Sequence, residues 1–93
     1  MIRLNGDRVE VSGPMTMADA ATLLTEGEAA IASKAATFDL AAVTDMDSSS
    51  LAVVFGWMRS ARAAGQTLHI QNPPQNLLSL AAVYGVADLL PQS

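Results

Sequence analysis

Helical and strand-like segments alternate along this chain, and that alternation limits the possible folds more than any other feature. Apolar residues recur at three- and four-residue spacing over Met17–Ala35, Ser49–Ala64 and Gln75–Tyr84, which predicts three helices. Thr37–Leu40 and Thr67–Ile70 are short and rich in apolar and β-branched residues, and we expect them to be strands. Strands that alternate with helices pair in parallel through crossovers, so the pattern predicts an α/β domain.

The N-terminal segment predicts a β-hairpin. Ile2–Leu4 and Val9–Val11 alternate apolar with polar residues, and Asn5-Gly6-Asp7 between them is typical of a tight turn. We expect the hairpin to end at Ser12-Gly13-Pro14, and Val86–Pro91 to form a short closing segment. The element order is therefore β-β-α-β-α-β-α, with a mixed but mostly parallel sheet.

The composition restricts the function classes. With 93 residues the chain fits one domain, over residues 1–93. Five basic residues against nine acidic ones argue against a nucleic-acid partner, because duplex binding requires clustered lysine and arginine. The absence of cysteine excludes a disulfide framework and a cysteine-based zinc site. No apolar run approaches the roughly 18–20 residues of a membrane span, so we expect no direct membrane insertion.

The most informative segment joins the second predicted helix to the strand before it. We expect Ala41–Asp47 to be a loop, and Asp47 or Ser48 to cap the helix by accepting hydrogen bonds from its first amides. A phosphate on Ser48 would face the free amides and the positive end of the helix dipole, and would add about −1.5 to −2 charges. Helix capping alone also explains serines at this place, so local chemistry leaves both readings open.

Asp47-Ser48-Ser49-Ser50-Leu51 resembles the Asp-Ser/Thr-Ser/Gly-Gly-Leu signature of STAS domains, the anti-sigma factor antagonist family. Phe38-Asp39-Leu40 is similar to the family's strand that ends in Asp/Asn-Leu, and Leu80–Val86 resembles its late helix with a glycine-containing exit. The resemblance implies a STAS fold with helices packed mainly on one face of the sheet. It also implies that Ser48 is the phosphoacceptor in regulated members. The family has glycine where this chain has Ser50, a change expected to alter the fit of a partner.

Within the family, the short chain, the hairpin and the ending Tyr84–Pro91 resemble the MlaB branch, the small STAS subunits of Mla phospholipid transporters. This implies a non-enzymatic regulatory and assembly subunit that docks onto an ABC transporter ATPase subunit and serves outer-membrane lipid asymmetry. It implies a cytoplasmic location, at the inner face of the inner membrane through the transporter complex. The alternative is an anti-sigma factor antagonist, controlled by phosphorylation of Ser48, whose partner is an anti-sigma factor kinase.

The predicted docking surface has Ser48 at its centre and the helix Leu51–Ala64 as its flank. Its members are Asp45, Asp47, Ser48, Ser49, Ser50, Leu51 and Arg59. Arg59 and Arg62 share a helix face, which is either solvated or turned toward acidic groups of a partner. Trp57 is either a partner anchor or buried, because it projects off the expected core face. That face consists of Leu51, Val54, Phe55 and Met58.

Signals for catalysis and for metal binding are weak. Asp45 and Asp47 are two carboxylates without an evident third ligand, so we expect no metal and no cofactor. No phosphate-binding loop, dinucleotide fingerprint or nucleophile elbow is present, and we expect no enzyme. A hydrolase or transferase with Ser48 as nucleophile would require His69 as its base, and we expect His69 at the surface or the sheet edge.

Overall fold

A four-stranded sheet and two long helices form the body of the domain. The computed structural model describes residues 1–90. Its elements are β1 (Ile2–Asn5), β2 (Arg8–Met15), α1 (Met17–Ala32), β3 (Thr37–Met46), α2 (Ser49–Ala63), β4 (His69–Gln71), α3 (Gln75–Val83) and the 3₁₀ turn η1 (Ala87–Leu89). The sheet order is β1-β2-β3-β4, with β1 antiparallel to β2 and the other pairs parallel. The predicted element order and the mixed, mostly parallel sheet are confirmed.

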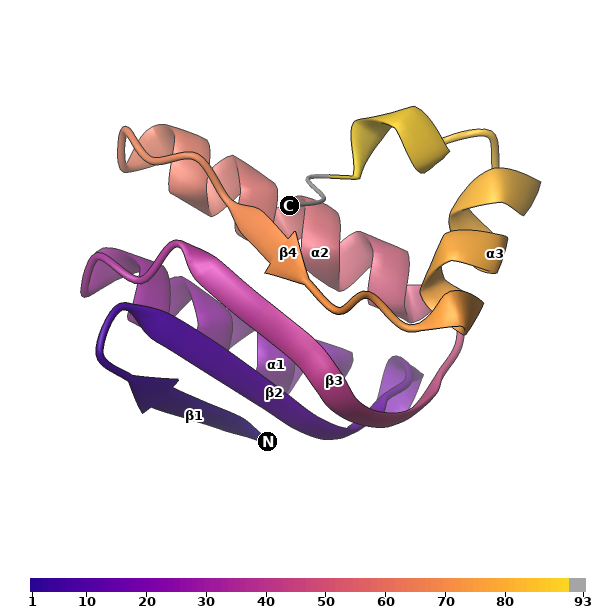
Figure 1. Cartoon of the computed structure of the whole chain (residues 1–93), viewed down its shortest axis with the longest axis horizontal. Coiled ribbons are helices and arrows are strands. Elements are labelled where there is room, and N and C mark those ends of the chain that lie inside the picture. Colours follow the sequence, from indigo (N-terminus) through magenta and orange to yellow (C-terminus); the bar gives the residue numbers. More distant parts are fainter. Residues whose placement is uncertain (91–93) are drawn as a thin grey trace.

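The core lies between the sheet and the pair α1 and α2, which cover one face together (Figure 1). Alternate strand residues point into it, and those from the central strands are fully buried: Val9, Val11, Phe38 and Leu40. Burying each such side chain contributes roughly 1.5–3 kcal/mol. Helix α3 and the turn η1 lie beside β4 rather than on the sheet face (Figure 1). The expected packing of helices mainly on one face is therefore confirmed.

The strands differ in length from the prediction. The hairpin ends where predicted, because the pairing of β1 with β2 stops at Ile2 and Val11, next to the hydrogen bond from the Ser12 amide to the Met1 carbonyl. The strand β2 itself continues to Met15, paired with β3 and with register shifts on both sides of Gly13. The predicted loop Ala41–Asp47 is wrong, because β3 continues to Met46 and pairs with this extension of β2. Beyond Leu40 most β3 residues are exposed, so the apolar alternation that marks a strand is lost there. At the other edge, β4 begins two residues later than predicted. The predicted closing segment contains η1, and Pro91 lies outside the described residues.

Asp39 of β3 connects β2 with the turn after β4, on the face of the sheet away from the helices. Its Oδ1 accepts hydrogen bonds from Asn72 Nδ2 at 3.0 Å and from the Ala41 amide at 2.9 Å, while Arg8 pairs with its Oδ2. The bond from Asn72 is the largest of these influences, and together they lower the pKa of Asp39. This network fastens the turn after β4 to the centre of the sheet.

Trp57 is buried between α1, α2 and the sheet, not projecting from the core as expected. Its side chain is 0% exposed, its ring centroid lies 4.6 Å from that of Phe38, and Nε1 donates to the Leu23 carbonyl at 3.1 Å. The buried side of α2 is rotated from the predicted one, because Phe55 and Met58 are only half-buried. The reason is that α2 packs against α1 as well as against the sheet. A partner-anchor role for Trp57 is therefore excluded in this conformation.

Three helices end with the same hydrogen-bond pattern, in which two amides after the helix bond back to its last turn. At α1, the amides of Lys34 and Ala35 donate to Ile31 and Ala30. The residue at this point has φ near +70° in each helix, and α2 and α3 have Gly65 and Gly85 there. Helix α1 instead has Lys34, with φ of 77°, two residues after its last residue Ala32, so the predicted end of this helix at Ala35 is wrong.

Replacing Lys34 by glycine is expected to stabilise the fold by about 1 kcal/mol, because a side chain is strained in the left-handed region. The reciprocal change Gly65→Lys is expected to cost about the same, since the space around Gly65 is open and only the backbone opposes a side chain. Urea unfolding followed by circular dichroism measures both. Equal stability of Lys34→Gly and wild type would contradict the assignment of strain.

Candidate docking surface at the start of α2

The corner where β3 meets α2 is held by one carboxylate. Asp47 Oδ1 accepts the Ser49 amide at 2.8 Å, and Asp47 Oδ2 accepts the Met17 amide at 3.0 Å. Ser49 begins α2 and Met17 begins α1, so a single side chain satisfies the first amide of both helices. Of the two residues predicted to cap the helix, Asp47 does so, and the Ser48 side chain makes no cap hydrogen bond.

These hydrogen bonds favour the ionised form of Asp47. The Met17 amide is the largest cause and the Ser49 amide the next, and together they lower the pKa of the Asp47 carboxyl from its ordinary 3.8. A lowered folded-state pKa means that the stabilising contribution is present above the ordinary pKa. It is lost as the pH falls through the folded value.

Asp47→Asn is therefore expected to lower the midpoint of thermal unfolding at pH 7, because an amide has one acceptor oxygen and can serve only one helix. The difference from wild type is expected to narrow as the pH falls below 3.8, the ordinary pKa of this carboxyl. Asp45→Asn is the matched control: it removes the same charge two residues away, where the carboxylate accepts, among residues 1–90, only the neighbouring Met46 amide. Calorimetry at several pH values measures both. Equal losses, or a gap independent of pH, would contradict the role of Asp47.

Ser48 is exposed, but the amides behind it are occupied. The Ser49 amide binds Asp47 Oδ1, the Ser50 amide binds the Asp47 carbonyl at 3.0 Å, and the Leu51 amide binds the Ser48 carbonyl at 3.2 Å. The expectation that a phosphate on Ser48 would meet free amides is wrong for this conformation. Such a phosphate would instead lie next to the Asp47 carboxylate and would compete with it.

Two residues of the predicted docking surface point inward. Ser50 is 0% exposed, and its Oγ donates to the Asp47 carbonyl at 2.7 Å. Leu51 is 6% exposed and belongs to the core. Neither side chain can contact a partner here, which corrects their assignment. The serine in place of the family's glycine is therefore accommodated inside the domain and does not project toward a partner.

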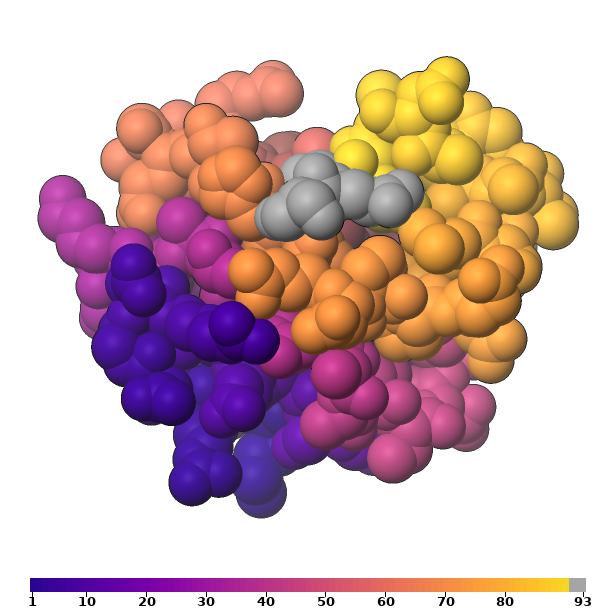
Figure 2. Space-filling model, viewed as in Figure 1, coloured from indigo at the N-terminus to yellow at the C-terminus, as the bar shows by residue number. Residues whose placement is uncertain are grey.

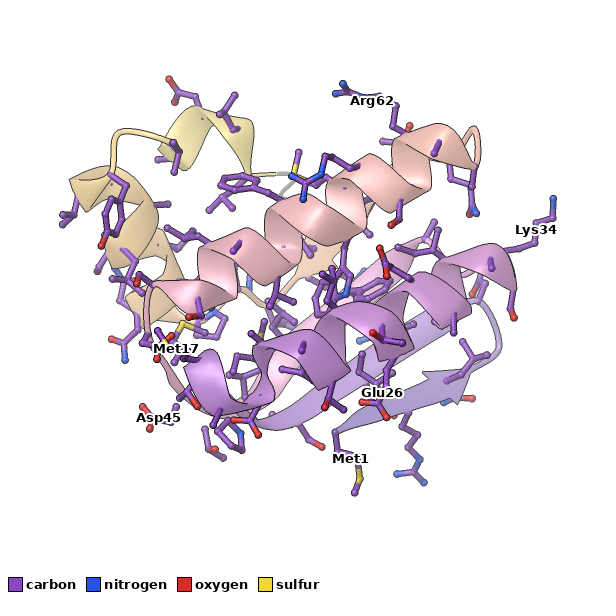
Figure 3. The ribbon with its side chains drawn as sticks, turned by 180° about the vertical axis from the view of Figure 1, so that it is seen from behind. Met1, Met17, Glu26, Lys34, Asp45 and Arg62 are labelled. Carbon is purple, nitrogen blue, oxygen red and sulfur yellow. The ribbon has the colours of Figure 1, made fainter. Side chains whose placement is uncertain are left out.

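The remaining predicted residues are accessible, and one further residue joins them. Asp45 and Ser48 are exposed and Ser49 is half-buried. Met17 is 76% exposed, and Figure 3 shows it in the same corner of the molecule as Asp45. No pattern in the sequence indicated Met17, because its neighbour Asp47 is 30 positions away in the chain. We call Met17, Asp45, Asp47, Ser48 and Ser49 the corner surface.

Arg59 does not join the corner surface. It is exposed on α2, three turns after Ser48, which places it about 16 Å further along the helix at 1.5 Å per residue. His69 is exposed on the edge strand β4, as expected. It pairs with Thr37 at the start of β3, whereas Ser48 follows the end of that strand, about 30 Å away at 3.3 Å per residue. His69 therefore cannot serve Ser48 as a base.

Residues 1–90 contain no cluster of three or more histidine, aspartate or glutamate side chains that could hold a metal ion. In the same part of the chain, no helix is long and apolar enough to cross a membrane.

The corner surface offers an exposed hydroxyl, two carboxylates and one large apolar side chain where the two helices begin. That combination is suited to contact with another protein.

Comparisons with solved structures agree with this fold. A putative anti-sigma factor antagonist from Thermotoga maritima has a TM-score of 0.76 and 14% identity, over 99% of this chain and 83% of that one. The Bacillus cell fate determinant SpoIIAA in its phosphorylated form has a TM-score of 0.67 and 17% identity, over 100% and 89%. The anti-sigma factor antagonist SpoIIAA in its unphosphorylated form has a TM-score of 0.65 and 17% identity, over 86% and 78%.

At the level of sequence, no curated protein matches this chain. A family model described as "Mlab, STAS domain" matches residues 2–91. This match covers nearly the whole chain and includes the residues of the Asp47–Leu51 signature. The chain therefore belongs to the MlaB-type STAS domain family.

Proposed function

We propose that this protein is a non-enzymatic subunit that docks onto the cytoplasmic ATPase of an Mla-type phospholipid ABC transporter. The observation that carries the proposal is the corner surface, where Ser48 is exposed and Asp47 fixes the starts of α1 and α2 together. A braced surface loses little conformational entropy on binding, which favours docking. Membership of an MlaB-type family supports an ABC ATPase as the partner.

The proposed role requires no catalysis by this chain. Ser48 is separated from His69 by the length of β3, and the Asp47 carboxylate is engaged in capping both helices. Regulation by docking also agrees with the kind of family to which the chain belongs. In this role the protein would be held at the inner face of the inner membrane by its partner.

Affinity purification of the tagged protein from its native cells, followed by mass spectrometry, tests the proposal. The expected result is co-purification of an ABC transporter ATPase in stoichiometric amount. Recovery of an anti-sigma factor kinase, with no ABC ATPase, would overturn it. A Ser48→Arg variant, which places a large charged side chain at the centre of the corner surface, serves as the negative control and is expected to lose the ATPase.

The second candidate is an anti-sigma factor antagonist controlled by phosphorylation of Ser48. It is favoured by the similarity in fold to SpoIIAA, whose structures are described in phosphorylated and unphosphorylated forms. In this protein a phosphate on Ser48 would stand beside Asp47 and would weaken the bridge between the helices by charge repulsion. Incubation with the cognate kinase and ATP, with Ser48→Ala as control, tests it by intact mass. No gain of phosphate on the wild type would remove this mechanism.

A further inference from the structure

The outer side of α2 carries a stripe of four residues that the corner surface does not include. Phe55, Met58, Arg59 and Arg62 are spaced three and four apart and therefore share one helix face. Phe55 and Met58 are half-buried, and the two arginines are exposed. The stripe begins about 10 Å beyond Ser48 along α2 at 1.5 Å per residue, and runs toward the opposite end of the helix.

This stripe forms one wall of a groove. Together with Leu89 of η1, its four residues line a cavity of about 200 Å³. Met58 and Arg62 also line a second cavity of about 260 Å³, which extends to Leu68 before β4. In Figure 2 the end of α2 (salmon) and η1 (yellow) stand apart along the upper edge of the molecule. Leu89 is 60% exposed, so the apolar side of the groove remains open to solvent.

The charge around the groove is opposite to that of the whole chain. The protein has nine acidic and five basic residues, yet two of its arginines lie side by side here. Within residues 1–90 the one ion pair is that between Arg8 and Asp39, so neither groove arginine has an acidic partner in that part of the chain. No acidic side chain of those residues lines the groove. Figure 3 shows Arg62 pointing away from the body of the protein.

We propose that this groove binds an acidic segment of a partner protein, with an apolar side chain against Phe55, Met58 and Leu89 and carboxylates on Arg59 and Arg62. Arginine suits this role because its planar guanidinium binds a carboxylate through two parallel hydrogen bonds. A concave site of this size admits one side chain of a narrow segment, not a flat membrane surface. Two arginines are also too few for duplex nucleic acid. The proposal does not depend on which partner binds the corner surface.

Model peptides test the groove without any native partner. The probe is a short helical peptide with leucine and phenylalanine on one face and glutamate elsewhere, titrated into the full chain labelled with ¹⁵N. We expect amide shifts at Phe55–Arg62 and Leu89, and weaker binding as salt is raised. A peptide with lysine in place of every glutamate is expected to bind at least about tenfold more weakly. Equal binding of both peptides, or shifts confined to the corner surface, would overturn the proposal.

Charge reversal supplies the matched pair of variants. Arg59→Glu/Arg62→Glu is expected to weaken binding of the acidic peptide by about tenfold or more, a loss typical of removing charge-assisted contacts. Arg3→Glu/Lys34→Glu changes the net charge equally at exposed sites outside the groove, and is expected to leave binding within about threefold of wild type. Equal losses in both variants would show a mere effect of net charge and would overturn the proposal.

Separate measurements test two other possible occupants of the groove. If a second copy of the chain fills the groove, sedimentation shows a dimer that Arg59→Glu/Arg62→Glu dissociates. If the arginines serve an anionic membrane, the protein co-sediments with phosphatidylglycerol vesicles. Either result would overturn the proposal, whereas a monomer that does not bind these vesicles supports it. Ser48→Asp is expected to leave peptide binding unchanged, so failure at the corner surface and failure at the groove are distinguishable.

Discussion

Gly27→Ala is expected to destabilise the fold by about 3 kcal/mol, although alanine usually stabilises the middle of a helix by about 1 kcal/mol relative to glycine. A Cβ atom at Gly27 would lie 2.5 Å from Cε2 and 2.7 Å from Cδ1 of Trp57, and closer still to Nε1. The indole is rigid, 0% exposed and packed on Phe38, so it has no space into which to move. Displacing it would also break its hydrogen bond to the Leu23 carbonyl.

Gly56→Ala is the matched control, because it makes the same substitution in the facing helix. A Cβ atom at Gly56 would meet one methyl group of Leu24, Cδ1 at 2.5 Å. Leu24 is half-buried and flexible, so it can rotate away, and we expect a change within about 1 kcal/mol. Urea unfolding followed by circular dichroism measures both. A neutral or stabilising Gly27→Ala would show that α1 and α2 do not pack through Trp57 as described.

A third variant identifies the source of the effect. In a Trp57→Leu background the indole is absent, and Gly27→Ala is expected to cost at least about 1 kcal/mol less than in wild type. An unchanged cost in that background would assign the destabilisation to something other than the contact between Gly27 and Trp57.

Ser48→Asp is expected to weaken docking onto the ATPase by about tenfold or more, whereas Ser48→Ala stays within about threefold. Aspartate adds a third carboxylate at a corner that already has Asp45 and Asp47. A partner surface that fits two carboxylates and a hydroxyl has no basic group for a third carboxylate. The new charge would therefore lose its water on binding without gaining an ion pair. Alanine removes only a small group whose side chain makes no cap hydrogen bond in the free protein.

Biolayer interferometry with the purified ATPase measures both Ser48 variants. Asn5→Asp is the control, because it adds one negative charge at the hairpin, which lies at the other end of the sheet from Ser48. Its affinity is expected to match that of wild type. Tight binding by Ser48→Asp would contradict docking at the corner surface. In a phosphorylation switch, Ala and Asp are instead expected to act in opposite directions on binding to the kinase.

Local patterns predicted most of the fold. The helical spacing located three helices, the alternation around Asn5-Gly6-Asp7 located the hairpin, and the order of elements indicated a mixed, mostly parallel sheet. What they missed was set by contacts between distant segments. The second half of β3 consists largely of small or polar exposed residues, and it is a strand because β2 pairs with it.

The candidate site shows the same division. The signature located Ser48 and Asp47, but not the direction of each side chain. Ser50 and Leu51 follow Ser48 directly and yet point inward, because the first turn of α2 carries them into the core. Met17 lies at the same corner because Met15 at the end of β2 pairs with Met46 at the end of β3, and the Met17 amide then donates to Asp47. Such a neighbour is invisible in one sequence, since nothing in the chain between them indicates the contact.

The burial of Trp57 gives this protein a built-in optical reporter. It is the only tryptophan in the chain, and its indole fills the space between α1 and α2, the two helices whose first amides bind Asp47. Indole emission depends on how much water surrounds the ring, so the unlabelled protein signals any separation of α1 from α2 by a shift to longer wavelength. A partner that binds the corner surface without separating α1 from α2 would leave the emission wavelength unchanged. A partner that separates the two helices would shift it to longer wavelength.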